Sequence, residues 1–393
     1  MQNMTFVQNF LAIFAFICFF FTLMISKFSS RFFNGKLLDQ DFLKPQAFHS
    51  EPIPRSGGLS IFLLFLIFIF FYYSFFNIVL KDYLIISFAL FSLGLLDDLK
   101  IKINPNIRLL LMTSVLILCI NLFSIEIDKT GLSFLNIWLE NKLFQNCFVL
   151  LCFLFVINGA NLVDGFNGLL GIHFLIINLI FLSVINDSSF SVILISQILS
   201  VFIFTLFNFP KAKIFLGDGG SYLLGVLLSL NSIKIYQLSS QLSPFFLAII
   251  LFYIFYEVFF SFIRKMYLGV SPLKPDKLHL HMLLYNLIKK KFGLAKSNYL
   301  TSLIINFLYL ILLIPAFYLK NDWLFCKMWF LFLIVIYSAF YFYLYKNHMR
   351  QSFLYHQLFL LCAHLNNRFV NSIRSAWMSA GSDHYIYTRF FSH

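Results

Sequence analysis

Two adjacent carboxylates are the strongest candidates for chemistry in this chain. Asp97 and Asp98 stand in the motif Gly94-Leu-Leu-Asp97-Asp98-Leu-Lys100, at the end of an apolar run. Adjacent carboxylates repel each other, so at a membrane boundary they indicate a divalent cation or a phosphate network that uses them. Lys100 adds a compact cation that suits phosphate. A solvated loop is the alternative interpretation.

Amides, a carboxylate and glycines combine in a second motif, which reads Asn158-Gly-Ala-Asn161-Leu-Val-Asp164-Gly165-Phe-Asn167-Gly168. Amide side chains read a base or a sugar through paired donors and acceptors, and glycines let the backbone approach a ligand closely. Ordinary turn chemistry explains the glycines and asparagines. It does not favour Asp164 at the edge of a membrane.

A third motif runs from Asn208 through Phe215 to Gly217-Asp218-Gly219-Gly220-Ser221 and opens the next apolar segment. Free backbone N–H groups at a helix start attract an anion, and a carboxylate beside them suits Mg²⁺. The motif lacks the Gly-Lys-Ser/Thr element of a Walker A loop. Asp218 as a plain helix cap is the alternative.

Imidazole and guanidinium groups lie in two further loops. His279 and His281 end the motif Ser271-Pro272-Leu-Lys274-Pro275-Asp276-Lys277-Leu-His279-Leu-His281. Two histidines at this spacing diverge on a helix, so hydrogen bonding to a diphosphate fits better than a two-histidine metal site. Attraction to anionic lipid is the simpler explanation of the basic loop and accounts for Lys289-Lys290-Lys291. Arg55, before Gly57-Gly58, is either a ligand or a topogenic charge.

The composition places these motifs in a membrane protein. Of the 393 residues, 60% are hydrophobic and 11% are charged, whereas soluble domains are about 25% charged. We therefore predict an all-α fold, a polytopic transmembrane helix bundle with about 10–11 spans of about 20 residues each. The predicted segments are 5–26, 58–80, 83–96, 109–124, 143–157, 169–185, 190–207, 221–233, 244–263, 299–319 and 324–345.

Three of these segments are short for a full crossing, namely 83–96, 143–157 and 221–233, and each adjoins a polar motif. Short or interrupted helices are tolerated at membrane depth where they line a polar cavity inside the protein. We therefore expect these three segments to border the functional site.

Lysine and arginine residues are distributed unequally between the two sides of this bundle. With the amino terminus outside, only six of the 29 fall on the outer side, namely Lys81, Lys129, Lys142, Lys234, Lys320 and Lys327. The positive-inside rule makes the opposite side cytoplasmic. All the polar motifs emerge there, which predicts an active-site cleft at the cytoplasmic face. Because short loops account for the formal charge of +13, we expect no nucleic acid as a partner.

One polytopic domain, residues 1–350, and a cytoplasmic tail, residues 351–393, account for the chain. The amino terminus lacks the positive region and the cleavage site of a signal peptide, so the first segment is expected to remain a membrane helix. The six cysteines show no CxxC spacing, which argues against disulfides and zinc. The first half of the tail is predicted to be an interfacial helix.

Taken together, the motifs resemble the polyprenyl-phosphate N-acetylhexosamine-1-phosphate transferase superfamily, glycosyltransferase family 4, which includes WecA-like enzymes and MraY phospho-MurNAc-pentapeptide translocases. The similar pieces, in order between His49 and His281, are PIPRSGG, GLLDDLK, NGANLVDGFNG, NFPKAKIFLGDGGS and SPLKPDKLHLH. The PDKLHLH form looks like the WecA branch, because the MraY branch usually has three consecutive histidines there.

The resemblance implies a Mg²⁺-dependent enzyme, with Mn²⁺ as a substitute. It implies transfer of N-acetylhexosamine-1-phosphate, GlcNAc-1-phosphate foremost, from a UDP-N-acetyl-sugar to undecaprenyl phosphate. The expected products are UMP and an undecaprenyl-diphospho-sugar that initiates a cell-envelope glycan. The implied location is the inner (plasma) membrane, and a homodimer is left open.

The same resemblance assigns the site residues. Asp97 and Asp98 would position or deprotonate the lipid phosphate, and Phe215 would stack on uracil. The full implied set is Asp97, Asp98 and Asp164 as catalytic residues, Asp218 as the metal ligand, and Arg55, Lys100, Asn158, Asn161, Asn167, Asn208, Phe215, His279 and His281 as substrate ligands.

Two positions depart from the family pattern. Asn167 stands where a second Asp is usual, which puts a base role there in doubt, and Glu257 stands where Asp is common. An inactive member of the family is therefore one alternative. The others are an MraY-type enzyme that uses UDP-MurNAc-pentapeptide, and a transporter or flippase of lipid-linked sugars that moves its substrate without cleaving a bond.

Overall fold

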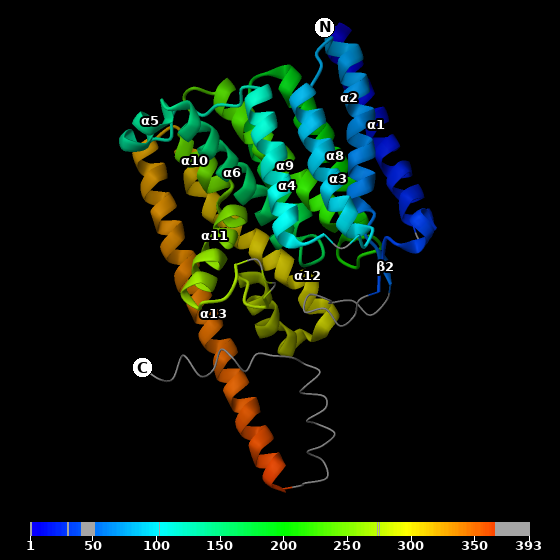
Figure 1. Ribbon diagram of the computed structural model, residues 1–393. Helices are drawn as coiled ribbons and strands as arrows, with labels where there is room; N and C mark the ends of the chain where they lie inside the picture. The colour runs from blue at the N-terminus through cyan, green and yellow to red at the C-terminus, as the bar shows by residue number, and fades with distance from the viewer. Residues whose placement is uncertain are drawn as a thin grey trace.

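The chain forms a bundle of helices (Figure 1). The computed structural model describes residues 2–29, 31–40, 52–101, 103–272, 274 and 276–365. The helices in these ranges are α1 Gln2–Phe28, η1 Phe32–Gly35, α2 Gly57–Phe76, α3 Lys81–Asp98, α4 Pro105–Leu122, α5 Ser133–Leu139, α6 Lys142–Val163, α7 Leu169–Val184, α8 Ser188–Asn208, α9 Gly217–Leu238, α10 Pro244–Ile250, α11 Phe252–Tyr267, α12 Leu280–Tyr318 and α13 Trp323–Leu365. Two short strands, β1 Leu38–Asp39 and β2 Ile53–Pro54, pair antiparallel.

The predicted all-α membrane bundle is confirmed. Ten of the eleven predicted segments each overlap one helix, and 244–263 overlaps the pair α10 and α11. By length and composition, seven of the described helices could cross a membrane, or eight if α10 and α11, bent by 76° at Leu251, form one broken span. This count is below the predicted ten to eleven. The difference lies in α3, α7 and α9, because α3 and α9 carry polar motifs and α7 has only 16 residues.

The expectation that segments 143–157 and 221–233 are short is wrong. Helix α6 has 22 residues and continues to Val163, so Asn158 and Asn161 lie inside its last turns. Helix α9 also has 22 residues and begins at Gly217, which puts Asp218 in its first turn. Asn158, Gly159 and Asn161 lie within α6, and Gly219 and Gly220 within α9, whereas Gly165, Asn167 and Gly168 form the turn after α6.

Helix α9 lies in the core of the bundle and is buried along almost its whole length. Near its far end, Asn231 donates to Asn178 Oδ1 on α7 at 2.8 Å and to Gln197 Oε1 on α8 at 2.7 Å. It also accepts from the Tyr83 hydroxyl on α3 at 2.9 Å. Polar groups at membrane depth must be satisfied within the protein, so this cluster ties four helices together.

Glycines bring backbones into contact at the other end of α9. A Cβ added to Gly58 would lie 2.3 Å from the Cα of Gly220, and one added to Gly94 would lie 2.5 Å from the carbonyl oxygen of Asp218. Small residues at helix interfaces permit this close approach. The first turn of α9 therefore packs directly on α2 and α3.

The segment around Arg55 is hydrogen-bonded to the loop that precedes α9. The Phe215 N–H donates to the Pro54 carbonyl at 2.8 Å, and the Phe215 carbonyl accepts from Gly57 N–H at 2.8 Å. Gly58 N–H then donates to the Leu216 carbonyl at 2.8 Å. These bonds place Arg55 beside Asp218 although the two residues are distant in the chain.

Helix α13 continues without interruption across the predicted domain boundary at residue 350 and ends at Leu365. Figure 1 shows it as a long helix that extends well beyond the rest of the bundle. Residues 366–393 lie outside the described residues, and the interfacial helix remains a prediction. His49, and Leu273 and Pro275 of the last motif, also lie outside them.

We predict that Gly58→Ala prevents stable folding, because its Cβ would overlap the Gly220 backbone and overpacking costs about 1–3 kcal/mol or more. Size-exclusion chromatography and thermal unfolding in detergent measure the effect. Gly165→Ala is the control, since a Cβ there would meet no atom nearer than 3.4 Å and Gly165 is not among the glycines with positive φ. Equal stability of the two variants would contradict the packing argument.

Candidate active site

The buried carboxylate of Asp98 caps the amino-terminal end of α9. Its Oδ1 accepts from Asp218 N–H and its Oδ2 from Gly219 N–H, both at 2.9 Å. Helix termini expose such unpaired N–H groups and favour negative charge. Gly217 has φ +79°, and a Cβ there would lie 2.6 Å from the Asp98 carboxylate. Glycine is therefore required for the Asp98 cap to form.

Arg55 lies between two carboxylates. Its Nε and Nη2 donate to Asp39 Oδ2 at 3.0 and 2.7 Å, and its Nη1 lies 3.6 Å from Asp98 Oδ1. Burial alone would lower the pKa of Arg55, but Asp218, Asp39 and Asp98 outweigh it and raise the pKa. A fixed positive charge, as predicted for a phosphate ligand, therefore lies beside the first turn of α9.

A second guanidinium, which was not among the predicted site residues, lies on the opposite side of Asp218. Arg108, in the first turn of α4, forms an ion pair with Asp97 and lies 4.0 Å from Asp218 Oδ2. Its side chain also approaches the Tyr222 ring, 6.0 Å from the centroid. The only signal in the sequence was a basic residue shortly after the Asp97-Asp98 pair.

Asp218 is oriented by the second motif. Asn161 Nδ2 donates to Asp218 Oδ1 at 3.2 Å and to Ser221 Oγ at 2.9 Å, and Ser221 Oγ donates to the Asp218 carbonyl at 3.0 Å. With 30% of its side chain exposed, Asp218 is more open than Asp97 or Asp98. This carboxylate can therefore accept a further ligand.

Asp164 stands at the carboxyl-terminal end of α6, close enough to Asp218 and Arg55 for their charges to act on it. Among the residues described, no side chain donates a hydrogen bond to its carboxylate. Burial and the negative charge of Asp218 raise the pKa of Asp164 to about 7, although Arg55 lowers it. This carboxylate therefore has unused acceptor capacity beside Asp218.

Two predicted substrate ligands are instead used inside the protein. Asn208 accepts from Gly168 N–H at 2.6 Å and donates to the Ile214 carbonyl at 2.9 Å. Asn167 donates through Nδ2 to the Pro210 carbonyl at 3.0 Å, while its N–H donates to Asn298. A carboxylate at position 167 could not donate to Pro210, which is a physical reason for Asn in place of the usual Asp.

Three other predicted ligands make no described contact with Asp218. Asn158 donates back to the Leu154 carbonyl of its own helix at 2.8 Å. Lys100 is exposed just beyond α3, with φ +61°. Phe215 is half-buried in the loop before α9. Lys100 is exposed and Asn158 and Phe215 are both only partly buried, so each of the three keeps some exposed surface.

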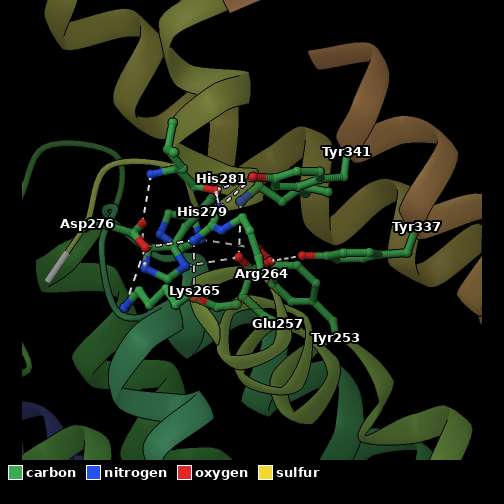
Figure 2. A network of polar contacts seen from close by, with 12 residues as sticks. Tyr253, Glu257, Arg264, Lys265, Asp276, His279, His281, Tyr337 and Tyr341 are labelled. Carbon is green, nitrogen blue, oxygen red and sulfur yellow. Dashed lines mark hydrogen bonds and ion pairs between the residues drawn. The ribbon is translucent and has the colours of Figure 1, made fainter. Parts of the chain in front are cut away.

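The predicted histidines lie in a separate, more enclosed cluster. Figure 2 shows His279 and His281 among charged and tyrosine side chains from α11, α12, α13 and the intervening loop. His279 is only 4% exposed and His281 is fully buried. A Cβ added to Gly165 would lie 3.4 Å from His281 Nε2. The cluster therefore adjoins the site through the turn that follows Asp164.

The charge balance of the site fits a cation. Its carboxylates, Asp39, Asp97, Asp98, Asp164 and Asp218, outnumber its guanidinium groups, Arg55 and Arg108. No three His, Cys, Asp or Glu side chains in the described part of the chain converge into a complete metal site. Mg²⁺ commonly takes one or two carboxylates and completes its shell with substrate phosphate and water. Asp218 fits that pattern.

One cavity of about 280 Å³ lies away from these residues. Its lining includes Phe153 of α6, Tyr236 of α9 and Leu247 of α10. Asp218 is at the opposite end of α9 from Tyr236, so the cavity is not part of the polar site.

Comparisons with known proteins agree with the motifs. Residues 80–236 match the family model described as Glycosyl transferase family 4. The chain is 29% identical over 286 residues to undecaprenyl-phosphate alpha-N-acetylglucosaminyl 1-phosphate transferase of Thermotoga maritima, covering 72% of this chain and 82% of the relative. It is 28% identical over 295 residues to a probable undecaprenyl-phosphate N-acetylglucosaminyl 1-phosphate transferase of Bacillus subtilis, covering 74% and 79%. It is also 33% identical over 149 residues to decaprenyl-phosphate N-acetylglucosaminephosphotransferase of Mycolicibacterium smegmatis, covering 32% and 37%.

We predict that Asp98→Asn destabilises the bundle. The amide keeps one acceptor but turns an N–H group toward the α9 amides, and a lost charge-assisted hydrogen bond costs about 1.5–3 kcal/mol. Thermal unfolding should show a clear decrease in midpoint. Asp97→Asn is the matched control, because Asp97 makes no bond to these amides and should shift the midpoint less. The reverse order would refute the capping role.

Proposed function

We propose a donor, an acceptor and products for this chain, which matches glycosyl transferase family 4 over residues 80–236 and is a multi-pass membrane glycosyl-1-phosphate transferase. It transfers N-acetylhexosamine-1-phosphate, most simply GlcNAc-1-phosphate, from a UDP-sugar to undecaprenyl phosphate. The products are undecaprenyl-diphospho-sugar and UMP, at the cytoplasmic face of the plasma membrane. The relatives' names support the acceptor and the sugar.

The observation that carries the proposal is the environment of Asp218. A half-open carboxylate at a helix start lies between Asn161 and Arg108, with Arg55 and Asp164 nearby. Helix starts, guanidinium groups and a metal-binding carboxylate are the groups that bind phosphates. Both proposed substrates are phosphate esters, so the site matches what they share.

The chemistry needs little base catalysis. A phosphate monoester has a second pKa near 6, so the lipid phosphate is largely ionised at neutral pH. One of its oxygens attacks the β-phosphorus of the UDP-sugar as the bond from that phosphorus to the bridging oxygen breaks. The bond electrons leave on UMP, and no net proton is transferred. The enzyme must mainly position and neutralise two polyanions.

The described residues divide this task. Arg55 and Arg108 neutralise phosphate oxygens, and the exposed Lys100 extends this positive surface. Asp218, with Asp164 beside it, would hold Mg²⁺, which supplies charge neutralisation on the diphosphate when bound. Phe215 presents a ring for uracil. Asp97 remains a candidate to orient the lipid phosphate.

Asp98 takes a different role from the one the resemblance implies. Both of its carboxylate oxygens accept backbone N–H groups of α9, and the side chain is only 2% exposed. We assign it to holding Asp218 in place, because both oxygens accept backbone N–H groups and the side chain is almost fully buried. Asn208 and Asn167 likewise hold the turn and the loop that flank the site.

The relatives also bear on the alternatives. Those with the greatest coverage are named as N-acetylglucosaminyl 1-phosphate transferases, which favours a simple hexosamine donor over the pentapeptide donor of MraY-type enzymes. A transporter gives no reason for a carboxylate cluster around a helix start. The orientation with the amino terminus outside rests on the distribution of basic residues.

We expect purified protein in detergent with Mg²⁺, undecaprenyl phosphate and UDP-GlcNAc to release UMP. Asp218→Asn should lower the rate by about 10²-fold or more, because it removes the carboxylate proposed to hold Mg²⁺ at the diphosphate. A coupled assay for UMP measures the rate, and a panel of UDP-N-acetylhexosamines identifies the donor. Lack of release with any donor would refute the proposal.

Metal dependence should vary with pH. Because the pKa of Asp164 is raised to about 7, its carboxyl is mostly protonated below that pH, and a cation must displace the proton to bind. The Mg²⁺ concentration for half-maximal rate should therefore rise as pH falls from about 8 to about 6. Asp164→Asn should flatten this dependence. An unchanged slope would exclude Asp164 as the coupled group.

A further inference from the structure

A buried clamp surrounds His279. Glu257 Oε1 lies 3.2 Å from His279 Nδ1 and accepts from Leu280 N–H at 3.0 Å, while Glu257 Oε2 accepts from the Tyr337 hydroxyl at 2.5 Å. Asp276 Oδ1 lies 3.4 Å from His279 Nε2. We call Glu257, Asp276 and Tyr337 the His279 clamp; Figure 2 shows it. It joins α11, the loop after it and α13.

The clamp occupies both nitrogens of His279. Asp276 is itself held by Arg264 at 2.7 Å and by Lys265 at 3.4 Å. Burial disfavours the charged form of Asp276, but His279, Arg264 and Lys265 outweigh it and lower its pKa. Because a carboxylate lies within ion-pair distance of each ring nitrogen, a substrate phosphate would have to compete with Glu257 and Asp276 for His279.

His281 connects the clamp to the active site. Its ring stacks on His279, with centroids 5.6 Å apart and planes at 7°. Its Nδ1 lies 3.4 Å from the Tyr253 hydroxyl, and its Nε2 has no hydrogen-bond partner among the described residues. The ring meets Phe166 edge-on at 5.7 Å and lies against Gly165. The position of His281 therefore sets that of the turn after Asp164.

We propose that Tyr337, Glu257 and His279 are positioning residues, which hold His281 against the turn that carries Asp164. Helices α11 and α13 thereby determine where one carboxylate of the active site lies, although neither helix contributes a residue to the cluster around Asp218. The link to catalysis rests on the function proposed above, but the link to the turn does not.

The cost of the clamp supports a positioning role. Buried charged groups lose solvation that their mutual attraction often fails to repay, so apolar residues of similar volume would stabilise a bundle as well or better. Ionisable residues within a membrane segment are therefore a sign of function. Here the stacked rings of His279 and His281 connect the clamp to the turn after Asp164, and to no other described part of the polar site.

Hydrogen–deuterium exchange tests the link without any substrate. Glu257→Gln and Tyr337→Phe should each raise the exchange rate in the peptide that contains residues 165–168 by about tenfold. That rise corresponds to a decrease of about 1.4 kcal/mol in the free energy of local opening. Tyr309→Phe is the matched control, because it removes a buried tyrosine hydroxyl that donates to the Ile250 carbonyl instead. Unchanged exchange in Tyr337→Phe, or an equal rise in the control, would overturn the proposal.

A double-mutant cycle on UMP release tests the consequence for catalysis. Glu257→Gln should lower kcat by about tenfold, as loss of supporting contacts does elsewhere, and Glu257→Asp should retain most of the rate. In a His281→Ala background, Glu257→Gln should have no further effect, since interacting residues are not additive. Fully additive losses would contradict the positioning role.

The two proposals fail in distinguishable ways. A wild-type protein that releases no UMP would refute the proposed function, while the exchange experiment would still decide whether the clamp holds the turn. His279→Ala that raises only the KM for the UDP-sugar, with kcat and exchange unchanged, would mean that His279 binds the donor directly and would overturn the positioning role.

Discussion

The site depends on one hydrogen-bonded ion: the carboxylate of Asp98 against the first two free amides of α9. Because both oxygens of Asp98 accept N–H groups at 2.9 Å, the ends of α3 and α9 are held together, and the orientation of Asp218 follows. Glycine at positions 94 and 217 is a precondition of this contact, since a side chain at either position would separate the two helices. The carboxylate at the end of α3 thus holds the first turn of α9 in place.

The other charged side chains of the site offset the cost of burying the Asp98 carboxylate at the edge of a membrane. Arg55 offsets Asp98 and Asp39, and Arg108 offsets Asp97. The carboxylates still exceed the guanidinium groups, and the proposed cation would offset that excess of negative charge. A metal ion brought with a nucleoside diphosphate would supply that charge, whereas a phosphate alone would not.

Two levels of support surround the reacting region. Asn161 and Asn208 hold Asp218 and the adjacent loop through amide hydrogen bonds close to the site. The His279 clamp acts from farther away, through stacked imidazoles that end at the turn after Asp164. Positioning of this kind suits phosphoryl transfer, in which placing and neutralising two anions matters more than proton transfer.

Composition and motif order by themselves predicted the membrane bundle, the family resemblance and most of the candidate site residues, because apolar length and carboxylate–glycine motifs are local features of the chain. Only the tertiary structure decided what each residue does. Asp98, Asn167 and Asn208 hold backbone groups, and Arg108 faces Asp218. These roles depend on which amide or carbonyl lies within about 3 Å of a side chain, and that is set by helix packing between segments far apart in sequence.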